Sequence, residues 1–273
     1  MNTVITHFYN EEYLLPWWIN HHKKIFDHGI MINYHSTDRS VEICKELCPP
    51  NWKIVNTVND TIVPKLNDAE VKVYENNLDG FKMVLTIGEF LLTPCPLDAI
   101  NSFMIQNKLD YIKTWGVCMV DTDTENLPTH DKSLLEQKHH GMITGYSSPL
   151  SMTIDPTHGW FPDSFKHLFS RYYHNQPFGK YTDGRHGLYN VADNKIFNAN
   201  NIFTLKYKYC PWNKTIIDRM RSFEVKKNEA DDRSRIFPKE EHNDIYRHFL
   251  STAYDLNTDP IFKSCYEYFM GLK

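Results

Sequence analysis

Short apolar runs alternate with longer amphipathic stretches over the first 55 residues of the chain. Short apolar runs predict strands, and the amphipathic stretches between them predict helices. The expected order is strand, helix, strand, helix, strand, at residues 3–9, 13–26, 29–34, 39–48 and 52–55. Strands that alternate with helices form parallel βαβ units, so the pattern predicts an α/β fold with a mostly parallel sheet flanked by helices.

The pattern stays regular as far as about residue 125 and loosens beyond it. Further elements are expected as a helix within 64–77, strands at 81–85 and 115–120, and helices near 97–107, 214–225 and 244–254. No repeat and no low-complexity linker separates the two halves. We therefore expect one domain with a regular half, about 1–125, and an irregular half, about 126–273.

Polar segments follow the first two predicted strands. Residues 10–12 (NEE) come after the first strand, and residues 36–38 (STD) come after the second. The carboxyl ends of parallel strands meet at one edge of a sheet, which is where open α/β sheets bind ligands. The same residue types also cap helices, so each segment alone fits an ordinary capping role.

Composition narrows the classes of protein further. The formal net charge is −4 and the isoelectric point is about 6.4, which argues against a broad nucleic-acid surface. No segment has the roughly 18 uninterrupted apolar residues of a membrane span, and no signal peptide is recognisable. The six scattered cysteines indicate reduced thiols. We expect a soluble cytoplasmic protein, which would be host cytoplasm for a viral one.

Several segments together carry a resemblance to a known family. Residues 8–18 (FYNEEYLLPWW), His21, His22 and residues 36–40 (STDRS) resemble the start of glycosyltransferase family 2 enzymes. The likeness extends to family-2-like proteins of giant DNA viruses and some bacteria, through the segments 171–175, 179–181 and 184–186. It covers roughly residues 3–210.

The resemblance implies a GT-A fold and a nucleoside-diphosphate sugar donor, often uridine-linked, with Mg²⁺ or Mn²⁺ as the common cofactor. It also implies an inverting transfer of the sugar to a hydroxyl of a glycan or protein acceptor. The regular half would bind the nucleotide and the irregular half would build the acceptor side. Donor-binding residues are expected at Asn10, Glu11, Asn33, Asp38, Thr86, Gly88, Arg171 and Arg185.

One departure from the family concerns the metal. Family members carry a D-x-D or D-x-D-E segment after the fourth strand, whereas this chain has Thr86, Ile87, Gly88 and Glu89 there. A divalent cation requires several oxygen ligands. Three outcomes remain open: a weak site at Glu89 helped by His186, metal-independent catalysis with Arg171, Arg185 or His186 offsetting the charge, or binding without catalysis.

A carboxylate must accept the proton of the attacking hydroxyl. Candidates are Asp121, Asp123 and Asp131, with Asp121 favoured because it ends a predicted strand. The DTD at 121–123 would equally suit metal ligation or a solvated acidic loop. Two other functions compete with sugar transfer: a degenerate sugar-nucleotide or glycan-binding protein, and a nucleotidyltransferase, for which no glycine-rich phosphate loop is present.

Overall fold

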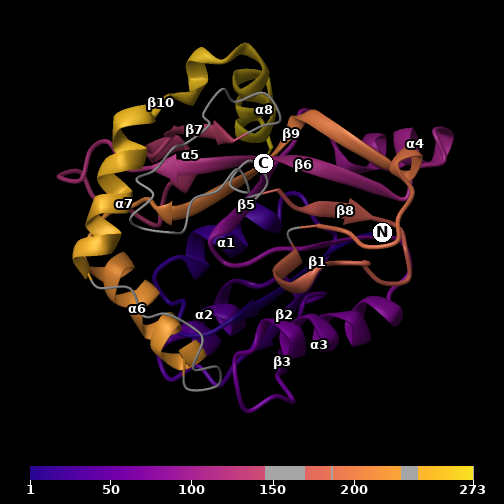
Figure 1. Ribbon diagram of the computed structural model, residues 1–273, viewed down its shortest axis with the longest axis horizontal. Helices are drawn as coiled ribbons and strands as arrows, with labels where there is room; N and C mark the ends of the chain where they lie inside the picture. The colour runs from indigo at the N-terminus through magenta and orange to yellow at the C-terminus, as the bar shows by residue number, and fades with distance from the viewer. Residues whose placement is uncertain (145–169, 186, 229–238, 273) are drawn as a thin grey trace.

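A computed structural model describes residues 1–144, 170–185, 187–228 and 239–272 of the chain (Figure 1). The strands join in the order β10-β7-β6-β8-β4-β1-β2-β3, and β9 pairs with β5 and β6. The predicted α/β class is confirmed, because a central sheet with a parallel N-terminal half is flanked by helices.

The N-terminal half is built from parallel strands. These strands are β1 (Asn2–Phe8), β2 (His28–Asn33), β3 (Lys53–Asn56) and β4 (Phe81–Val84). The helices between them are α1 (Leu15–His22), α2 (Ser40–Leu47) and α3 (Pro64–Asn76). Each element lies within a few residues of its predicted range. The carboxyl ends of β1, β2 and β4 therefore lie at one edge of the sheet.

The remaining strands make the other half of the sheet largely antiparallel. They are β5 (Glu89–Leu92), β6 (Tyr111–Val120), β7 (His140–Thr144), β8 (Tyr172–His174), β9 (Ile196–Tyr209) and β10 (Tyr254–Asp255). The long strand β9 was not predicted. It runs parallel to β6 and antiparallel to β5, so it carries residues from late in the chain beside the turn after β4.

Side chains of the parallel strands alternate between two hydrophobic clusters. Val4 and Met83 face a cluster that includes α1, whereas Ile5 and Val84 face a second cluster that includes Val71 of α3. This alternation follows the two-residue period of a strand buried on both faces. The sheet is thereby held rigidly, which fixes the position of its carboxyl edge.

The other helices are α4 (Leu97–Gln106), α5 (Leu134–Gln137), α6 (Lys214–Asn228), α7 (Lys239–Thr252) and α8 (Pro260–Met270). Helix α8 was not predicted, although Asp259 caps its first turn and Pro260 starts it. Among the described residues, no helix combines the length and apolarity needed to cross a membrane. All six cysteines are free.

Candidate functional site

The loops after β1 and β2 are joined by hydrogen bonds. The Oδ1 of Asn10 accepts from the backbone N–H of Thr37 at 2.8 Å, and the N–H of Asn10 donates to Ser36 Oγ at 3.1 Å. The two carboxylate oxygens of Asp38 accept from the N–H groups of Glu12 and Ser40, each at 3.0 Å. The structure brings the two polar loops together as the strand order requires, and most of their polar atoms bond to one another.

Asn33 and Glu11 belong to the same edge and also have partners. The Oδ1 of Asn33 accepts from Ser36 N at 2.9 Å, and its Nδ2 donates to Asn56 at 3.0 Å. Glu11 is buried and makes a bidentate ion pair with Arg219 of α6. Burial raises the pKa of Glu11, and Arg219 opposes that shift. Helix α6 is thus tied to the start of α1 by charge.

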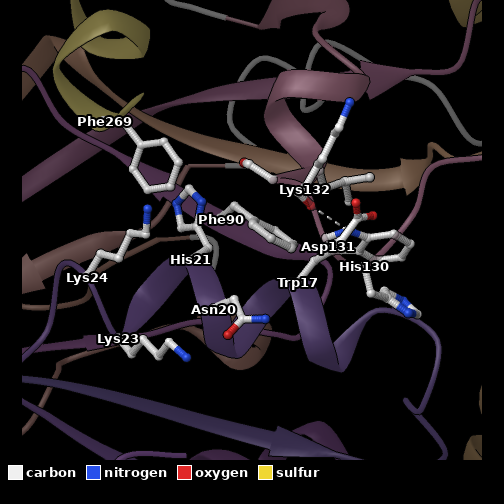
Figure 2. A pocket seen from close by; sticks show the side chains of 12 residues that line it. Trp17, Asn20, His21, Lys23, Lys24, Phe90, His130, Asp131, Lys132 and Phe269 are labelled. Atoms are coloured by element: carbon white, nitrogen blue, oxygen red, sulfur yellow. Dashed lines mark hydrogen bonds between the residues drawn. The ribbon is translucent and has the colours of Figure 1, made fainter. Parts of the chain in front are cut away.

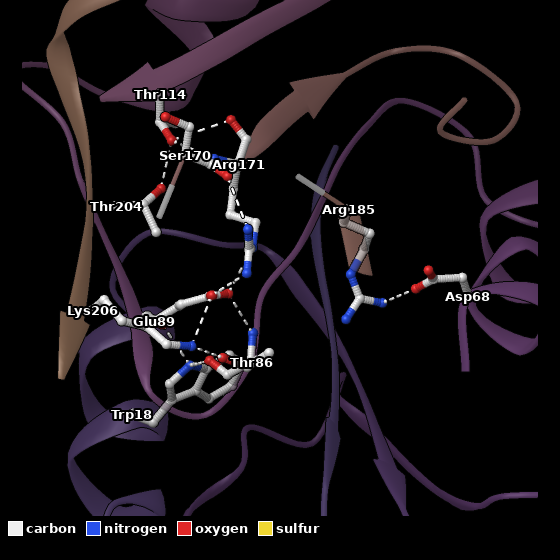
Figure 3. A network of polar contacts seen from close by, with 10 residues as sticks. All are labelled: Trp18, Asp68, Thr86, Glu89, Thr114, Ser170, Arg171, Arg185, Thr204 and Lys206. Carbon is white, nitrogen blue, oxygen red and sulfur yellow. Dashed lines mark hydrogen bonds and ion pairs between the residues drawn. The ribbon is translucent and has the colours of Figure 1, made fainter. Parts of the chain in front are cut away.

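Residues 86–88 form a tight turn between β4 and β5 (Figure 3). The N–H of Glu89 donates to Thr86 O at 2.9 Å, and the carboxylate of Glu89 accepts from Thr86 N at 2.8 Å. The indole N–H of Trp18 donates to the carbonyl oxygens of both residues. Trp17 and Trp18 are both buried in the hydrophobic core. The turn is therefore fixed by α1 beneath it.

Glu89 is fully buried and holds two basic side chains (Figure 3). Arg171, just before β8, bonds both carboxylate oxygens, and Lys206 of β9 lies 2.9 Å from Oε1. Burial alone would raise the pKa of Glu89, but Arg171 and Lys206 outweigh it and hold that pKa below its usual range. The carboxylate is consequently a counter-ion for two positive charges.

These contacts do not fit the expected role of Glu89 as a metal ligand. Its oxygens already accept from Arg171, Lys206 and the turn backbone. Two unit charges of like sign roughly 4 Å apart repel by about 4 kcal/mol at an effective dielectric constant of about 20, and a divalent cation would face both basic groups. No group of three or more His, Cys, Asp or Glu suited to a metal occurs within the described part of the chain. His186 lies outside the described residues.

Arg185 is a third basic group at this edge (Figure 3). Its Nη1 lies 2.9 Å from Asp68 of α3, and the adjacent N–H of Gly184 donates to the same carboxylate. Gly184 and Arg185 have φ values of 77° and 64°, a left-handed turn that is uncommon for arginine. The side chain is only 5 % exposed, yet its Nε–H has no acceptor among the described residues. A buried guanidinium with a free donor suits an anionic ligand.

The charged groups around His7, near the end of β1, are mostly basic. Burial and then Arg185 lower its pKa to about 3, Lys206 and Arg171 lower it further, and Glu89 alone among the named charges raises it. Asp68 pairs with Arg185, so these three basic groups face two carboxylates and the balance is positive. The end of β1 is electropositive, although the protein as a whole is acidic.

The two candidate bases of the DTD segment have different surroundings. Asp121 is fully buried, its Oδ1 lies 2.8 Å from Lys138, and its Oδ2 accepts from Trp212 N at 2.8 Å. These bonds anchor the end of β6 to later segments of the chain. Asp123 is exposed, and hydrogen bonds from Asn126 lower its pKa. Only Asp123 of this pair is open to a solvent-borne acceptor.

A pocket of about 210 Å³ lies beside α1 (Figure 2). Trp17 and His21 of α1 line it, together with Lys24 after the end of that helix, Asp131 and Phe269. The third base candidate, Asp131, therefore sits at this pocket. The described donor-binding candidates lie elsewhere, at the sheet edge.

Comparisons with known proteins give limited similarity. No family model and no curated protein matches the sequence. A mannosyltransferase from Pyrobaculum calidifontis, solved with GDP-mannose and Mn²⁺, has a TM-score of 0.41 and 9 % identity over 100 % of this chain and 75 % of its own. Glucosyl-3-phosphoglycerate synthase from Mycobacterium tuberculosis has a TM-score of 0.31 and 14 % identity, over 42 % and 44 %.

A UDP-glucose pyrophosphorylase solved with UDP-glucose has a TM-score of 0.28 and 10 % identity, over 53 % of this chain and 67 % of its own. The α/β architecture described above rests on the strand order of this chain itself. The likeness to giant-virus proteins stays a prediction.

Two site residues were not predicted from the sequence. Lys206 and Arg219 are the partners of Glu89 and Glu11, from which they are 117 and 208 residues apart along the chain. The alternating run at 204–208 is typical of a strand, and recognising it would have placed Lys206 on one face of β9. Its pairing with Glu89 depends on the β5–β9 register, which the sequence does not specify.

Proposed function

We propose that the chain binds a nucleoside-diphosphate sugar at the carboxyl edge of β1, β2 and β4 and transfers the sugar to a hydroxyl acceptor. The observation that carries this proposal is the group of three basic side chains at that edge, Arg171, Arg185 and Lys206, which outnumber the two carboxylates that pair with them, Glu89 and Asp68. A diphosphate brings two negative groups, and charge increases on it as the bond to the sugar breaks. Preorganised basic donors in a partly buried site stabilise that charge.

The position of the cluster agrees with the resemblance to glycosyltransferases. The turn of Thr86 and Gly88 occupies the place of the family's diphosphate-binding segment, and Lys206 lies against it. The joined loops of Asn10 and Asp38 lie at the neighbouring strand ends, where the nucleoside is expected. This arrangement favours a donor whose phosphates point to β4 and whose nucleoside points to β2.

Asp123 is the proposed general base. The acceptor hydroxyl would lose its proton to this carboxylate while its oxygen bonds to the anomeric carbon. The bond from that carbon to the phosphate oxygen breaks, and the nucleoside diphosphate leaves with the electron pair. Asp121 is the weaker candidate, because Lys138 and Trp212 already occupy its oxygens. Asp123→Asn is expected to lower turnover by roughly 10²-fold or more while donor binding is unchanged.

A thermal-shift screen against UDP-, GDP- and dTDP-sugars, with and without Mn²⁺, tests donor binding. A ligand at 100 times its dissociation constant stabilises a protein by about 2.7 kcal/mol. Transfer is then measured as release of nucleoside diphosphate. Donor binding without turnover would favour the degenerate binding protein, and no shift with any donor would contradict the proposal.

Arg185→Met provides a residue-level test. This change removes a buried guanidinium that would donate hydrogen bonds to a phosphate. We expect it to weaken the binding of the sugar nucleotide about 10- to 100-fold. Arg221→Met is the matched control, because Arg221 is exposed on α6. Isothermal titration of both variants with the best donor of the screen measures the difference. Equal affinities in the two variants would show that Arg185 does not bind the sugar nucleotide.

A further inference from the structure

We propose that the ammonium group of Lys206 is a built-in replacement for the divalent cation, so that the diphosphate of the donor is held without metal. This inference rests on the proposed function, since it assigns a role within the same site. It names a residue outside the family motif and explains why both aspartates of that motif are absent.

The position of Lys206 carries the argument (Figure 3). Its Nζ donates to Thr86 Oγ1 at 2.8 Å and to Glu89 Oε1 at 2.9 Å. A Cβ built at Gly88 would lie 3.8 Å from the same Nζ. The ammonium therefore lies among the three positions that correspond to the metal-holding carboxylates of the D-x-D-E segment. A cation bound by those carboxylates would occupy the place that Lys206 fills.

The remaining donor of Lys206 is available to a ligand. An ammonium has three N–H groups, and two of them bond to Thr86 and Glu89. The third has no acceptor in the described part of the chain, and the side chain remains 19 % exposed. Burial lowers the pKa of Lys206, and the Glu89 carboxylate opposes this shift. Glu89 thus both positions the ammonium and favours its charged form.

The charge balance of the turn also agrees with the inference. A D-x-D-E segment holds three carboxylates, which need a divalent cation before a diphosphate can approach. Here one carboxylate meets two basic groups, Arg171 and Lys206, so the site is positive before any ligand binds. Thr86, Gly88 and Lys206 together thus give this turn a fixed positive charge in place of two aspartates and a bound cation.

Isothermal titration with inorganic pyrophosphate, UDP and GDP in EDTA tests the inference. The unmodified protein is expected to bind at least one of them in EDTA, with little change on adding Mn²⁺. Lys206→Met is expected to weaken that binding about 10- to 100-fold. Lys195→Met is the matched control, because Lys195 precedes the other end of β9 and is 39 % exposed.

A second variant is designed to make diphosphate binding depend on metal. Thr86→Asp, Gly88→Asp and Lys206→Met together restore the two carboxylates and remove the ammonium. The backbone at Gly88 is not in the left-handed region and the nearest atoms are 3.8 Å away, so a side chain fits there. Pyrophosphate binding by this triple variant is expected only with Mn²⁺. If Lys206→Met does not fold, Lys206→Gln replaces it in both tests, because glutamine removes the charge but keeps a polar hydrogen-bonding group.

The outcomes separate the two proposals. Binding by the unmodified protein that requires Mn²⁺ would overturn the role of Lys206 and leave the proposed function standing. Metal-free binding by the triple variant would also overturn it. Metal-free, Lys206-dependent binding of pyrophosphate without binding of any sugar nucleotide would support the inference and contradict the proposed function. Absence of binding to every probe, with and without Mn²⁺, would overturn both.

Discussion

The β1–β2 edge and the turn after β4 differ in how their polar side chains are paired. At the β1–β2 edge, Asn10, Asn33 and Asp38 bond to backbone and side chains of the adjacent loop. At the turn after β4, one buried carboxylate binds two basic side chains, Arg171 from the segment just before β8 and Lys206 from β9. The first arrangement consists of many modest bonds near solvent, and the second of few bonds between buried charges. Substitutions at the two places should therefore differ greatly in effect.

The largest effect is expected for Glu89→Gln. This change removes the counter-ion of Arg171 and Lys206 in a fully buried position, and breaking a buried ion pair costs about 3–5 kcal/mol. Urea denaturation followed by circular dichroism measures the loss of unfolding free energy. Glu267→Gln on the exposed face of α8 is the control and should change stability by less than about 0.5 kcal/mol. A similar small change for Glu89→Gln would show that the buried charges are not coupled.

An intermediate loss of unfolding free energy is expected when the pH is lowered. Burial lowers the pKa of His7 to about 3 and that of His21 to about 4, both from 6.5. Each histidine is neutral in the folded protein between pH 6.5 and 4 but takes up a proton in the unfolded chain. The contribution of these two histidines to the unfolding free energy is therefore constant above pH 6.5 and falls between pH 6.5 and 4. The slope is at most about 1.4 kcal/mol per pH unit for each buried histidine, and less for the partly exposed His7.

Unfolding free energies measured between pH 7.5 and 4 would detect this slope. His21→Gln should reduce it, because glutamine does not titrate. An unchanged slope in His21→Gln would mean that other groups dominate the acid response.

The smallest effect is expected for Asp38→Ala at the β1–β2 edge. The loss removes two hydrogen bonds to backbone N–H groups, one of Glu12 in the loop after β1 and one of Ser40 at the start of α2, worth about 1–2 kcal/mol together. Thermal unfolding measures it, with Asp218→Ala of an exposed α6 ion pair as the control. A loss as large as that of Glu89→Gln would erase the distinction between the two regions.

Much of the fold follows from local pattern. The elements from β1 to β4 and helix α4 lie close to their predicted ranges, because apolar spacing, proline and capping residues act over a few neighbours. Strand β9 was missed, since Asn198, Asn200 and Asn201 in its first half are residues typical of loops. The meeting of the polar loops at the β1–β2 edge was predicted, because parallel strands bring their carboxyl ends to one edge.

The sequence by itself determined the α/β class, the place of the candidate site and the absence of both aspartates from the turn after β4. Only the tertiary structure decided the role of Glu89, because Lys206 of β9 and Arg171, just before β8, reach it through strand pairings that are set by packing. A lone glutamate in a sequence fits a metal ligand or a counter-ion equally well. The choice depends on which charges the fold brings within bonding distance, and here those charges belong to Arg171 and Lys206.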